Sequence, residues 1–341
     1  MFVIQPYNDE LLSSWFIRLA RVNHTNVSSI VRYIFQDDLL SEHTKKFHIK
    51  DMDLYELSDE QKNILYLNTG VSINELQLFK YSGFLDESID RYKKLWISEP
   101  NATKHNTKKF LGPRYCPKCL EEKPYIRQLW RIMLYNICAQ HNCYLLCQCQ
   151  FCNEKFMYYD NGYTKKMYVC HKCNFDLRKS KVIYVTKTKH LINQSKIMNI
   201  LQVGYYKLYN RYYYSIGLFK LLKSIVLSMI HLKNKKIKYI KQITPCELAK
   251  YISHAMFLLE KFPTRLNKCY KNNGLTDIHN ILHWNDRDKK KCNLPNWFLN
   301  GIEYSVITKT GKIKVIKFTH ATQQKHVDNR QYATQIYTKK S

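Results

Sequence analysis

The sequence has no long apolar run. Nowhere among its 341 residues do about eighteen apolar residues follow one another, the length that a transmembrane helix needs. The closest approach begins at Ser215 and is interrupted by Lys220 and Lys223. The first ten residues, MFVIQPYNDE, lack the basic start and apolar core of a secretory signal. We therefore expect a protein that does not enter a membrane and that stays in the cytoplasm, where cysteines remain reduced.

Common catalytic motifs are also lacking. There is no HExxH motif, no glycine-rich phosphate loop, and no HxE motif beside a PCxxC motif as in zinc deaminases. Scattered carboxylates leave a metal-dependent nuclease of mobile-element origin open as an alternative: Asp51, Asp53, Asp286 and Asp288. Nothing in their spacing singles them out, so we expect a protein that is not an enzyme.

Acidic residues are scarce in the second half of the chain. Residues 1–174 hold 23 lysines and arginines against 19 acidic residues, a balance of +4, whereas residues 175–341 hold 32 against 8, a balance of +24. Such a surplus repels itself unless an anion is nearby, and each cation that meets a phosphate releases a counterion. A general drift toward lysine would have affected both halves, so we expect the second half to bind nucleic acid.

Two clusters of cations are the candidate DNA contacts. The residues are Lys233, Lys235, Lys236 and Lys238 in the first cluster, and Arg287, Lys289, Lys290 and Lys291 in the second. The second cluster is interrupted only by Asp288 and lies where a second helix-turn-helix can be hidden. It is also short enough to be only a solvated loop, and both interpretations stay open.

The cysteines are concentrated in the middle of the chain. Nine of the twelve lie between Cys116 and Cys173, where the motifs CPKC, CAQH, CQFC and CHKC each place two residues between two ligand residues. Zinc prefers four thiolate or imidazole ligands at tetrahedral angles, and two ligands at this spacing fit one tight knuckle. The intervals of 18 residues between the first and second knuckles and of 17 between the third and fourth are those of a zinc ribbon.

The pairing of neighbouring knuckles predicts two structural zinc ions per chain. The first set is Cys116, Cys119, Cys138 and His141; the second is Cys149, Cys152, Cys170 and Cys173. Each set is complete without an open position, so metal binding is expected to stabilise the fold. Cys143 and Cys147 have no partner at this spacing; either can replace a neighbouring ligand, and we expect both to pack in the interior.

Periodic apolar residues predict helices before the cysteines. Residues 8–22 show an apolar face, with Asn8 as the expected N-cap, formed by Leu11, Leu12, Trp15, Phe16, Leu19 and Val22. Ser58 with Gln61, and Ser72 with Glu75, make two capping boxes on either side of a turn at Gly70. This is a helix-turn-helix-like pattern. The second helix, residues 73–81, carries a single cation, which favours packing over DNA contact.

Later segments carry mixed signals. Residues 181–186, KVIYVT, predict a strand, and the tyrosine- and lysine-rich sequence that follows is expected to be helical. Tyrosines at helical spacing favour core packing over base stacking. Thr244, Pro245 and Glu247 predict the start of another helix, and residues 312–318, KIKVIKF, predict one strand or hairpin.

Together these patterns predict a mainly α, multidomain protein. We expect an N-terminal helical domain with helix-turn-helix character over residues 1–110 and a double zinc-ribbon module over residues 111–180. A basic helical domain follows over residues 181–310, and a basic tail over residues 311–341. The first boundary follows from the polar, basic stretch around Pro100.

Several motifs resemble the TniQ/TnsD family of transposition proteins. RYCPKCL (114–120), YIRQLWR (125–131), CAQH, CQFCN and CHKCNFDL are similar to its zinc region, and PYNDELLSSWFIRLARVN (6–23) and LNTGVSINEL (67–76) to its N-terminal part. The resemblance spans roughly residues 4–180. Asn142 and Asn153 stand where the family often has glycine, and Gln150 where it often has proline; every ligand position is kept.

The resemblance implies a target-site selector of a Tn-type mobile element, acting at the bacterial nucleoid. Such proteins are not enzymes; they mark an insertion site and recruit an AAA+ ATPase regulator, which brings the transposase. One branch of the family reads DNA directly through zinc fingers and helix-turn-helix units. The other, usually shorter, sits as a homodimer on a CRISPR effector complex with its guide RNA. We expect the first role, with DNA and the ATPase as partners, and keep the second as the alternative.

Overall fold

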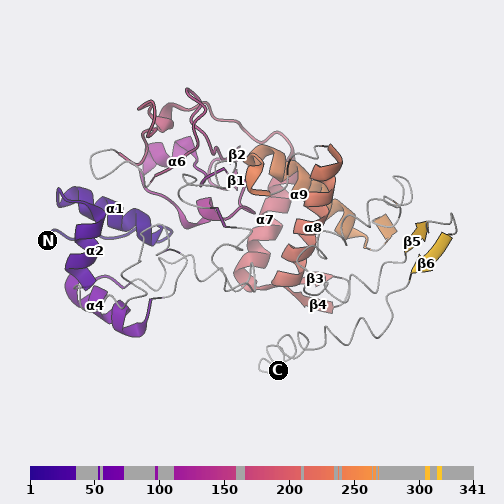
Figure 1. The fold of residues 1–341 in the computed structure, drawn as a ribbon, viewed down its shortest axis with the longest axis horizontal. Coiled ribbons are helices and arrows are strands. Elements are labelled where there is room, and N and C mark those ends of the chain that lie inside the picture. The colour runs from indigo at the N-terminus through magenta and orange to yellow at the C-terminus, as the bar shows by residue number, and fades with distance from the viewer. Residues whose placement is uncertain are drawn as a thin grey trace. The chain divides into compact units, whose positions relative to one another are not determined.

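The computed structural model divides into two compact units (Figure 1). One consists of Met1–Ser195 with Lys241–Ala249, and the other of Lys196–Ile240 with Lys250–Ser341. The structure describes residues 1–35, 53, 57–72, 97–98, 111–158, 166–208, 211–233, 237, 240–262, 264–265, 268, 304–307 and 313–316. Within these ranges no helix combines the length and apolar character that crossing a membrane requires.

The described residues of the N-terminal part of the first unit form three helices: α1 (Leu12–Val22), α2 (Val27–Phe35) and α4 (Asp59–Thr69). Helix α2 packs against both α1 and α4 (Figure 1). The predicted apolar face of α1 is buried through Leu19, whereas Val22 is exposed. It meets Ile30, Ile34 and Phe35 of α2 in one core. The apolar spacing of α1 therefore predicted its packing face correctly over most of its length.

Helix α1 begins later than expected, because Asn8 is not its cap. Leu11 is the N-cap residue and has no side-chain cap hydrogen bond. Its backbone N–H donates instead to the carbonyl of Ile126 at 2.9 Å. A hydrogen bond to a distant residue thus satisfies the Leu11 N–H, which a local cap at Asn8 was expected to satisfy.

Helix α4 begins and ends as predicted. The backbone N–H of Gln61 donates to Ser58 Oγ at 3.2 Å, and the Ser58 N–H donates to Gln61 Oε1 at 3.0 Å, which is the expected capping box. Gly70 ends the helix at φ 67°, a left-handed conformation that favours glycine. The second predicted helix, residues 73–81, lies outside the described residues.

A buried polar network joins α1 to η4 (Gln128–Arg131). Its centre is Asp53, whose Oδ1 accepts from the Ser13 N–H at 2.9 Å and whose Oδ2 accepts from Ser13 Oγ at 2.7 Å. Arg131 Nη1 donates to the same Oδ2 at 2.8 Å, and both charged side chains are fully buried. Arg131 also donates to the Ser98 carbonyl. The N-terminal helices are thereby held to the cysteine-rich part of the unit by a buried ion pair and the hydrogen bonds around it.

The cysteine-rich part has short elements: α6 (Pro117–Glu122), β1 (Ile137–Cys138), β2 (Cys143–Tyr144) and η5 (Leu177–Lys179). Strands β1 and β2 pair antiparallel, with Cys138 opposite Cys143. Instead of the strand predicted for residues 181–186, a single bridge joins Tyr184 to Cys143. The described residues of this region therefore contain little regular secondary structure to stabilise its fold.

The later elements are α7 (Thr188–Val203), β3 (Tyr205–Leu208), β4 (Arg211–Tyr214), α8 (Ser215–Lys233), η6 (Ile240–Gln242) and α9 (Pro245–Glu260). The prediction of helix for the tyrosine-rich sequence was wrong over β3 and β4, which form an antiparallel hairpin with Tyr205 opposite Tyr214. Gly204, at φ 79°, follows α7 and lets the chain turn. Beyond it, aromatic residues suit a strand well.

Two predictions near the C-terminal end agree with the structure. Helix α9 starts at Pro245, with Thr244 Oγ1 bonded to Glu247 Oε2 at 2.9 Å. The KIKVIKF segment contains β6 (Ile313–Ile316), which pairs antiparallel with β5 (Tyr304–Ile307). The described elements are thus mainly helices, with three separate two-stranded sheets.

Candidate metal centres

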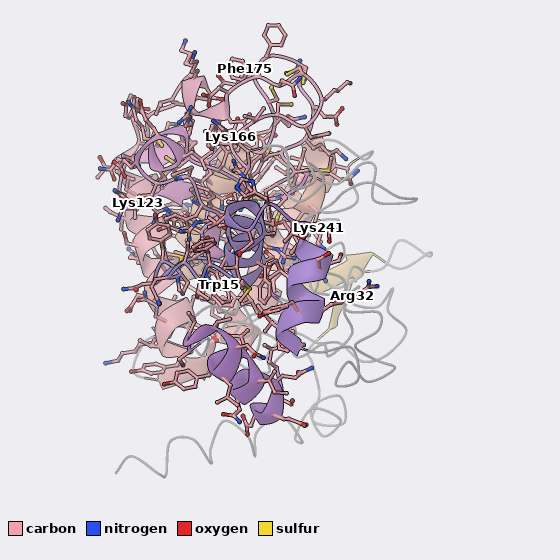
Figure 2. The ribbon with its side chains drawn as sticks, turned by 90° about the vertical axis from the view of Figure 1, so that its left-hand side faces the viewer. Trp15, Arg32, Lys123, Lys166, Phe175 and Lys241 are labelled. Carbon is pink, nitrogen blue, oxygen red and sulfur yellow. The ribbon has the colours of Figure 1, made fainter. Side chains whose placement is uncertain are left out.

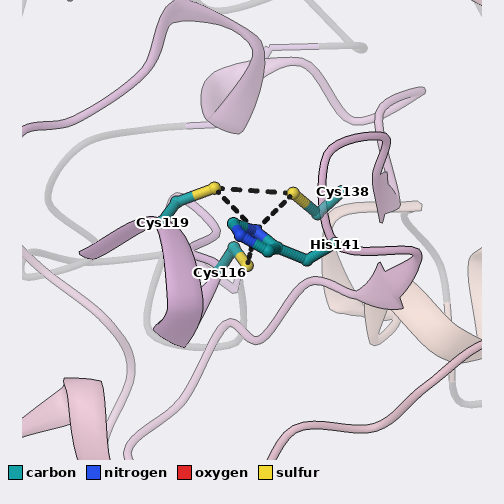
Figure 3. Close-up of side chains that lie close together, drawn as sticks. All are labelled: Cys116, Cys119, Cys138 and His141. Atoms are coloured by element: carbon teal, nitrogen blue, oxygen red, sulfur yellow. Dashed lines mark hydrogen bonds between the residues drawn. The ribbon is translucent and has the colours of Figure 1, made fainter. Parts of the chain in front are cut away.

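The first candidate centre is built by α6 and the β1–β2 hairpin. Cys116 is the N-cap residue of α6 and Cys119 lies within that helix, while Cys138 ends β1 and His141 lies in the turn before β2. The Nδ1 atom of His141 is 3.5, 3.3 and 3.5 Å from the sulfurs of Cys116, Cys119 and Cys138. Figure 3 shows the imidazole facing these three sulfurs. Four ligand atoms from two separate segments therefore converge on one point.

Glu122 orients His141 from outside this group. The Nε2 atom of His141 is 2.8 Å from Glu122 Oε1, so the imidazole presents Nδ1 to the sulfurs and Nε2 to the carboxylate. Histidine ligands of metals characteristically make such a contact with their second nitrogen. Burial lowers the pKa of His141, but the Glu122 contact and the facing thiols outweigh it and raise the pKa to about 9. Metal binding at Nδ1 must therefore displace a proton.

The spacing of the ligand atoms fits a tetrahedral ion. With Zn–S bonds of about 2.3 Å, the sulfurs of a tetrahedral site lie about 3.8 Å apart. The Cys119 and Cys138 sulfurs are 3.5 Å apart, and all four ligand atoms of the set lie within 4.8 Å of one another. A disulfide would require about 2.05 Å. The arrangement suits a metal ion held between the four groups.

The second candidate centre consists of two similar knuckles. The first, residues 149–153, is closed by a bridge between Gln148 and Lys155, and the second, residues 170–174, by a bridge between Val169 and Asp176. Across the knuckles the Cys149 and Cys173 sulfurs are 3.6 Å apart, and so are those of Cys152 and Cys170. These four ligand atoms also lie within 4.8 Å of one another. The structure thus brings together the same two sets of four residues that the spacing predicted.

Asparagine follows three of the four knuckles in a left-handed conformation. The φ angles are 50° at Asn142, 57° at Asn153 and 60° at Asn174. In the second centre, the Asn153 and Asn174 N–H groups donate back to the Cys149 and Cys170 carbonyls at 2.9 and 3.0 Å. Asparagine is the residue after glycine that best tolerates this region. The two departures from the family's glycines, at Asn142 and Asn153, therefore leave the knuckle turn intact.

This conformation makes a stability prediction at Asn153. Asn153→Ala should destabilise the protein by about 1 kcal/mol, because a Cβ without the polar side chain is disfavoured in the left-handed region. Asn153→Gly should change stability by less than about 0.5 kcal/mol, because glycine adopts this conformation freely. Urea denaturation of both variants checks this. Equal destabilisation by the two substitutions would contradict the argument.

Gln150 supplies a second support for the first of these knuckles. Its Nε2 donates to the Lys181 carbonyl at 3.0 Å, and its Oε1 accepts from the Lys181 N–H at 2.6 Å. Both backbone groups of Lys181 are thus bonded to one side chain. A proline at position 150 would make neither bond, so Gln150 fixes the knuckle by a cross-link to the chain that follows the second centre.

Cys143 and Cys147 both lie in the interior, but in different surroundings. The Cys143 sulfur is 3.6 Å from that of Cys116, so a fifth thiol adjoins the first centre. Cys147 is buried, and burial raises its pKa to about 12 although Arg114 opposes the shift. Arg114 itself donates through Nη1 to three backbone carbonyls, those of Ile132, Met133 and Tyr135. Both pack in the interior as expected, and Cys143 also adjoins a predicted ligand, as the alternative of a replacement ligand requires.

The predicted DNA contacts are mostly outside the described residues. Lys233 is the last residue of α8. The other seven, Lys235, Lys236, Lys238, Arg287, Lys289, Lys290 and Lys291, lie outside, as do Asp51, Asp286 and Asp288 of the nuclease alternative. Asp53, the fourth carboxylate of that alternative, is fully buried, and its two oxygens accept from Ser13 and Arg131. Asp53 is therefore a structural group and not an open metal ligand.

Comparison with known families decides what the N-terminal part is. Residues 1–145 match the model of the TniQ family. The chain carries a TniQ domain. The match confirms the resemblance to TniQ over residues 1–145, from α1 through the first candidate metal centre. A search of curated proteins found no match. The second centre and all later elements lie beyond the matched residues, and the TniQ domain associates the protein with transposition.

Proposed function

We propose that this protein is a zinc-dependent, DNA-binding target-site selector of a Tn-type transposon. In this role it recruits an AAA+ ATPase regulator to the insertion site and, through that regulator, the transposase. The TniQ domain supports a part in transposition as an adaptor and not as an enzyme. The two sets of four ligands support zinc as the metal that holds the domain together.

Zinc in this proposal is structural. The eight ligands are Cys116, Cys119, Cys138 and His141 in the first centre, and Cys149, Cys152, Cys170 and Cys173 in the second. Seven thiolates and one imidazole are the donors that zinc prefers. A zinc ion in each centre would fix segments that share little regular secondary structure, so that its binding free energy becomes folding free energy.

The observation that carries the DNA-binding proposal is a long stretch without acidic residues. From Leu177 to Cys246 the chain has fifteen lysines and arginines and no aspartate or glutamate. This stretch follows the second candidate centre directly and contains α7, the β3–β4 hairpin and α8. Such a segment has no internal counter-charges, and phosphates of DNA can supply them.

The proposal predicts a preference for the element's own flanking DNA. At about 0.15 M salt, the purified protein should bind a duplex from the insertion site at least about 100-fold more tightly than a random duplex, because specific complexes retain contacts that salt does not weaken. Gel-shift titration and footprinting measure this. Changing Lys233, Lys235, Lys236 and Lys238 together to glutamine should weaken both complexes and reduce the salt dependence of each. The log–log slope should fall by up to about 0.9 for each phosphate that the variant no longer neutralises.

Controls separate direct reading from guided targeting. Lys62→Gln and Lys118→Gln remove exposed cations that pair with Asp59 and Glu121, and they should leave both affinities unchanged. Equal affinity for the flanking and random duplexes would rule out direct site reading. Co-purification with a guide-RNA-bound CRISPR effector complex would then favour the adaptor role.

A further inference from the structure

A pair of stacked phenylalanines, Phe151 exposed and Phe175 half-buried, lies on the second candidate metal centre. Phe151 is inside the first knuckle, between Gln150 and Cys152, and Phe175 follows the second knuckle. Their ring centroids are 6.0 Å apart with an interplanar angle of 8°, so the rings are stacked. Phe151 is 74% exposed. Figure 2 shows Phe175 at the upper edge of the drawn side chains.

The position of this pair is fixed by the fold. Phe151 directly precedes the predicted ligand Cys152, and Phe175 lies two residues after the predicted ligand Cys173. The Cys170 N–H also donates to the Phe175 carbonyl at 2.9 Å. Both rings are thus held on short, closed turns. A rigid aromatic surface loses little conformational entropy when it binds a ligand.

The chain around the pair is rich in cations. Lys172 lies within the second knuckle and is exposed, and Lys181 is exposed and bonded through its backbone to Gln150, the neighbour of Phe151. Over residues 166–189 there are seven lysines and arginines against one acidic residue, Asp176, which is paired with Arg178. Even after a four-cysteine zinc site adds roughly two negative charges, this segment keeps a positive excess.

This combination favours nucleic acid over a protein partner. The cores of protein–protein interfaces are depleted of lysine, whereas surfaces that bind single strands combine cations for the backbone with aromatic faces on which bases stack. In an intact duplex the bases stack on one another and offer no free face. A stacked phenylalanine pair beside lysines therefore suits bases that are unpaired.

We propose that Phe151 and Phe175 form a stacking platform for unpaired bases of DNA, with Lys172 and Lys181 contacting the adjacent phosphates. The inference rests on the proposed DNA-binding function and adds a site to it: the second metal centre would hold a locally opened or single-stranded segment. Lys172 is available for this role because its 3.2 Å contact with Glu154 is an exposed ion pair, which phosphate can replace at little cost.

The test compares a fluorescein-labelled single strand of about 20 nucleotides with its matched duplex, by fluorescence anisotropy at about 0.15 M salt. The full-length double variant Phe151→Ala/Phe175→Ala should bind the single strand at least about tenfold more weakly, as expected when a base loses its aromatic partner. Its affinity for the duplex should change by less than about twofold, because the phosphate contacts remain. Phe151→Tyr, which keeps a ring, should retain single-strand affinity.

Two controls keep the result interpretable. Tyr66→Ala removes an aromatic side chain that is 54% exposed on α4 and should change neither affinity. Native mass spectrometry should find the same metal content in each variant as in the unmodified protein. If the double variant loses metal, the single change Phe151→Leu, which removes the ring from an exposed side chain, replaces it and should give the same selective loss.

Each other outcome has a defined meaning. An unchanged single-strand affinity, or an equal loss for single strand and duplex, would overturn the stacking platform. In the first case the pair would remain as a contact for a protein. The proposed target-site function fails separately, when the unmodified protein shows no preference for the flanking duplex over a random one.

Discussion

Cys119→Ser should release one zinc ion per chain and unfold the cysteine-rich part of the TniQ domain. In the proposed zinc site Cys119 would join α6 to the β1–β2 hairpin, and the binding free energy of a structural zinc ion, on the order of 10 kcal/mol, is folding free energy. Loss of one thiolate leaves three ligands and exposes a hairpin of only two short strands. We expect destabilisation of more than about 3 kcal/mol, measured by urea denaturation, and one zinc ion instead of two by native mass spectrometry.

Cys246→Ser is the matched control. Cys246 is half-buried, lies outside both candidate centres and packs against the small cluster of Ile137, Tyr144 and Ala249. The same substitution there should cost less than about 1 kcal/mol and leave both zinc ions in place. A folded Cys119→Ser protein with unchanged zinc content would show that Cys119 is not a required ligand of the first centre. In that case Cys143, whose sulfur adjoins Cys116, is the replacement ligand to test.

The grouping of the two ligand sets was predictable because each knuckle is a local structure. Two ligands separated by two residues can meet one ion whatever surrounds them, so only the pairing of knuckles needed tertiary information. Glu122 was predictable too, since it follows Cys119 by three residues and such residues share a helix face. A search for ligands alone overlooks it, because it contacts His141 and not the site itself.

Contacts between distant residues were not predictable. Cys143 and Cys116 are 27 residues apart, and Asp53 and Arg131 are 78 apart. No periodicity links either pair, because the fold of the whole unit brings them together. The same limit explains Leu11, whose N–H meets the Ile126 carbonyl where a local cap at Asn8 was expected.

The tyrosine-rich hairpin shows a different limit. Tyrosines in the segment from Tyr205 to Tyr214 fit a helical face as well as an alternating strand, so periodicity could not decide between them. The left-handed turn at Gly204 ends α7, so the tyrosines that follow do not continue that helix and form a strand. Core packing was favoured over base stacking because the tyrosines were thought to follow helical spacing. Tyr205 and Tyr206 instead lie opposite Tyr214 and Tyr213 in a hairpin, so that argument does not apply to them.

Asp53 is the position where a single change should most weaken the N-terminal half of the TniQ domain. Its carboxylate accepts from Ser13 on α1 and from Arg131 of η4, and the Asp53 and Arg131 side chains are both fully buried. An ion pair exposed to water would contribute little to the free energy of unfolding. When both partners of an ion pair are buried, removing one charge takes a charged partner from the other, at a cost of about 3–5 kcal/mol.

Asp53→Asn should therefore destabilise the protein by about 3 kcal/mol, which lowers the melting temperature by about 6–12 °C in a unit of this size. Asp59→Asn is the matched control, because Asp59 is fully exposed and its ion pair with Lys62 should contribute little to stability. Scanning calorimetry measures both. Zinc content should stay at two ions per chain in each variant, since Asp53 contacts neither centre. Equal melting temperatures for the two variants would contradict the assignment of Asp53 as the group that fixes α1 to the metal-binding region.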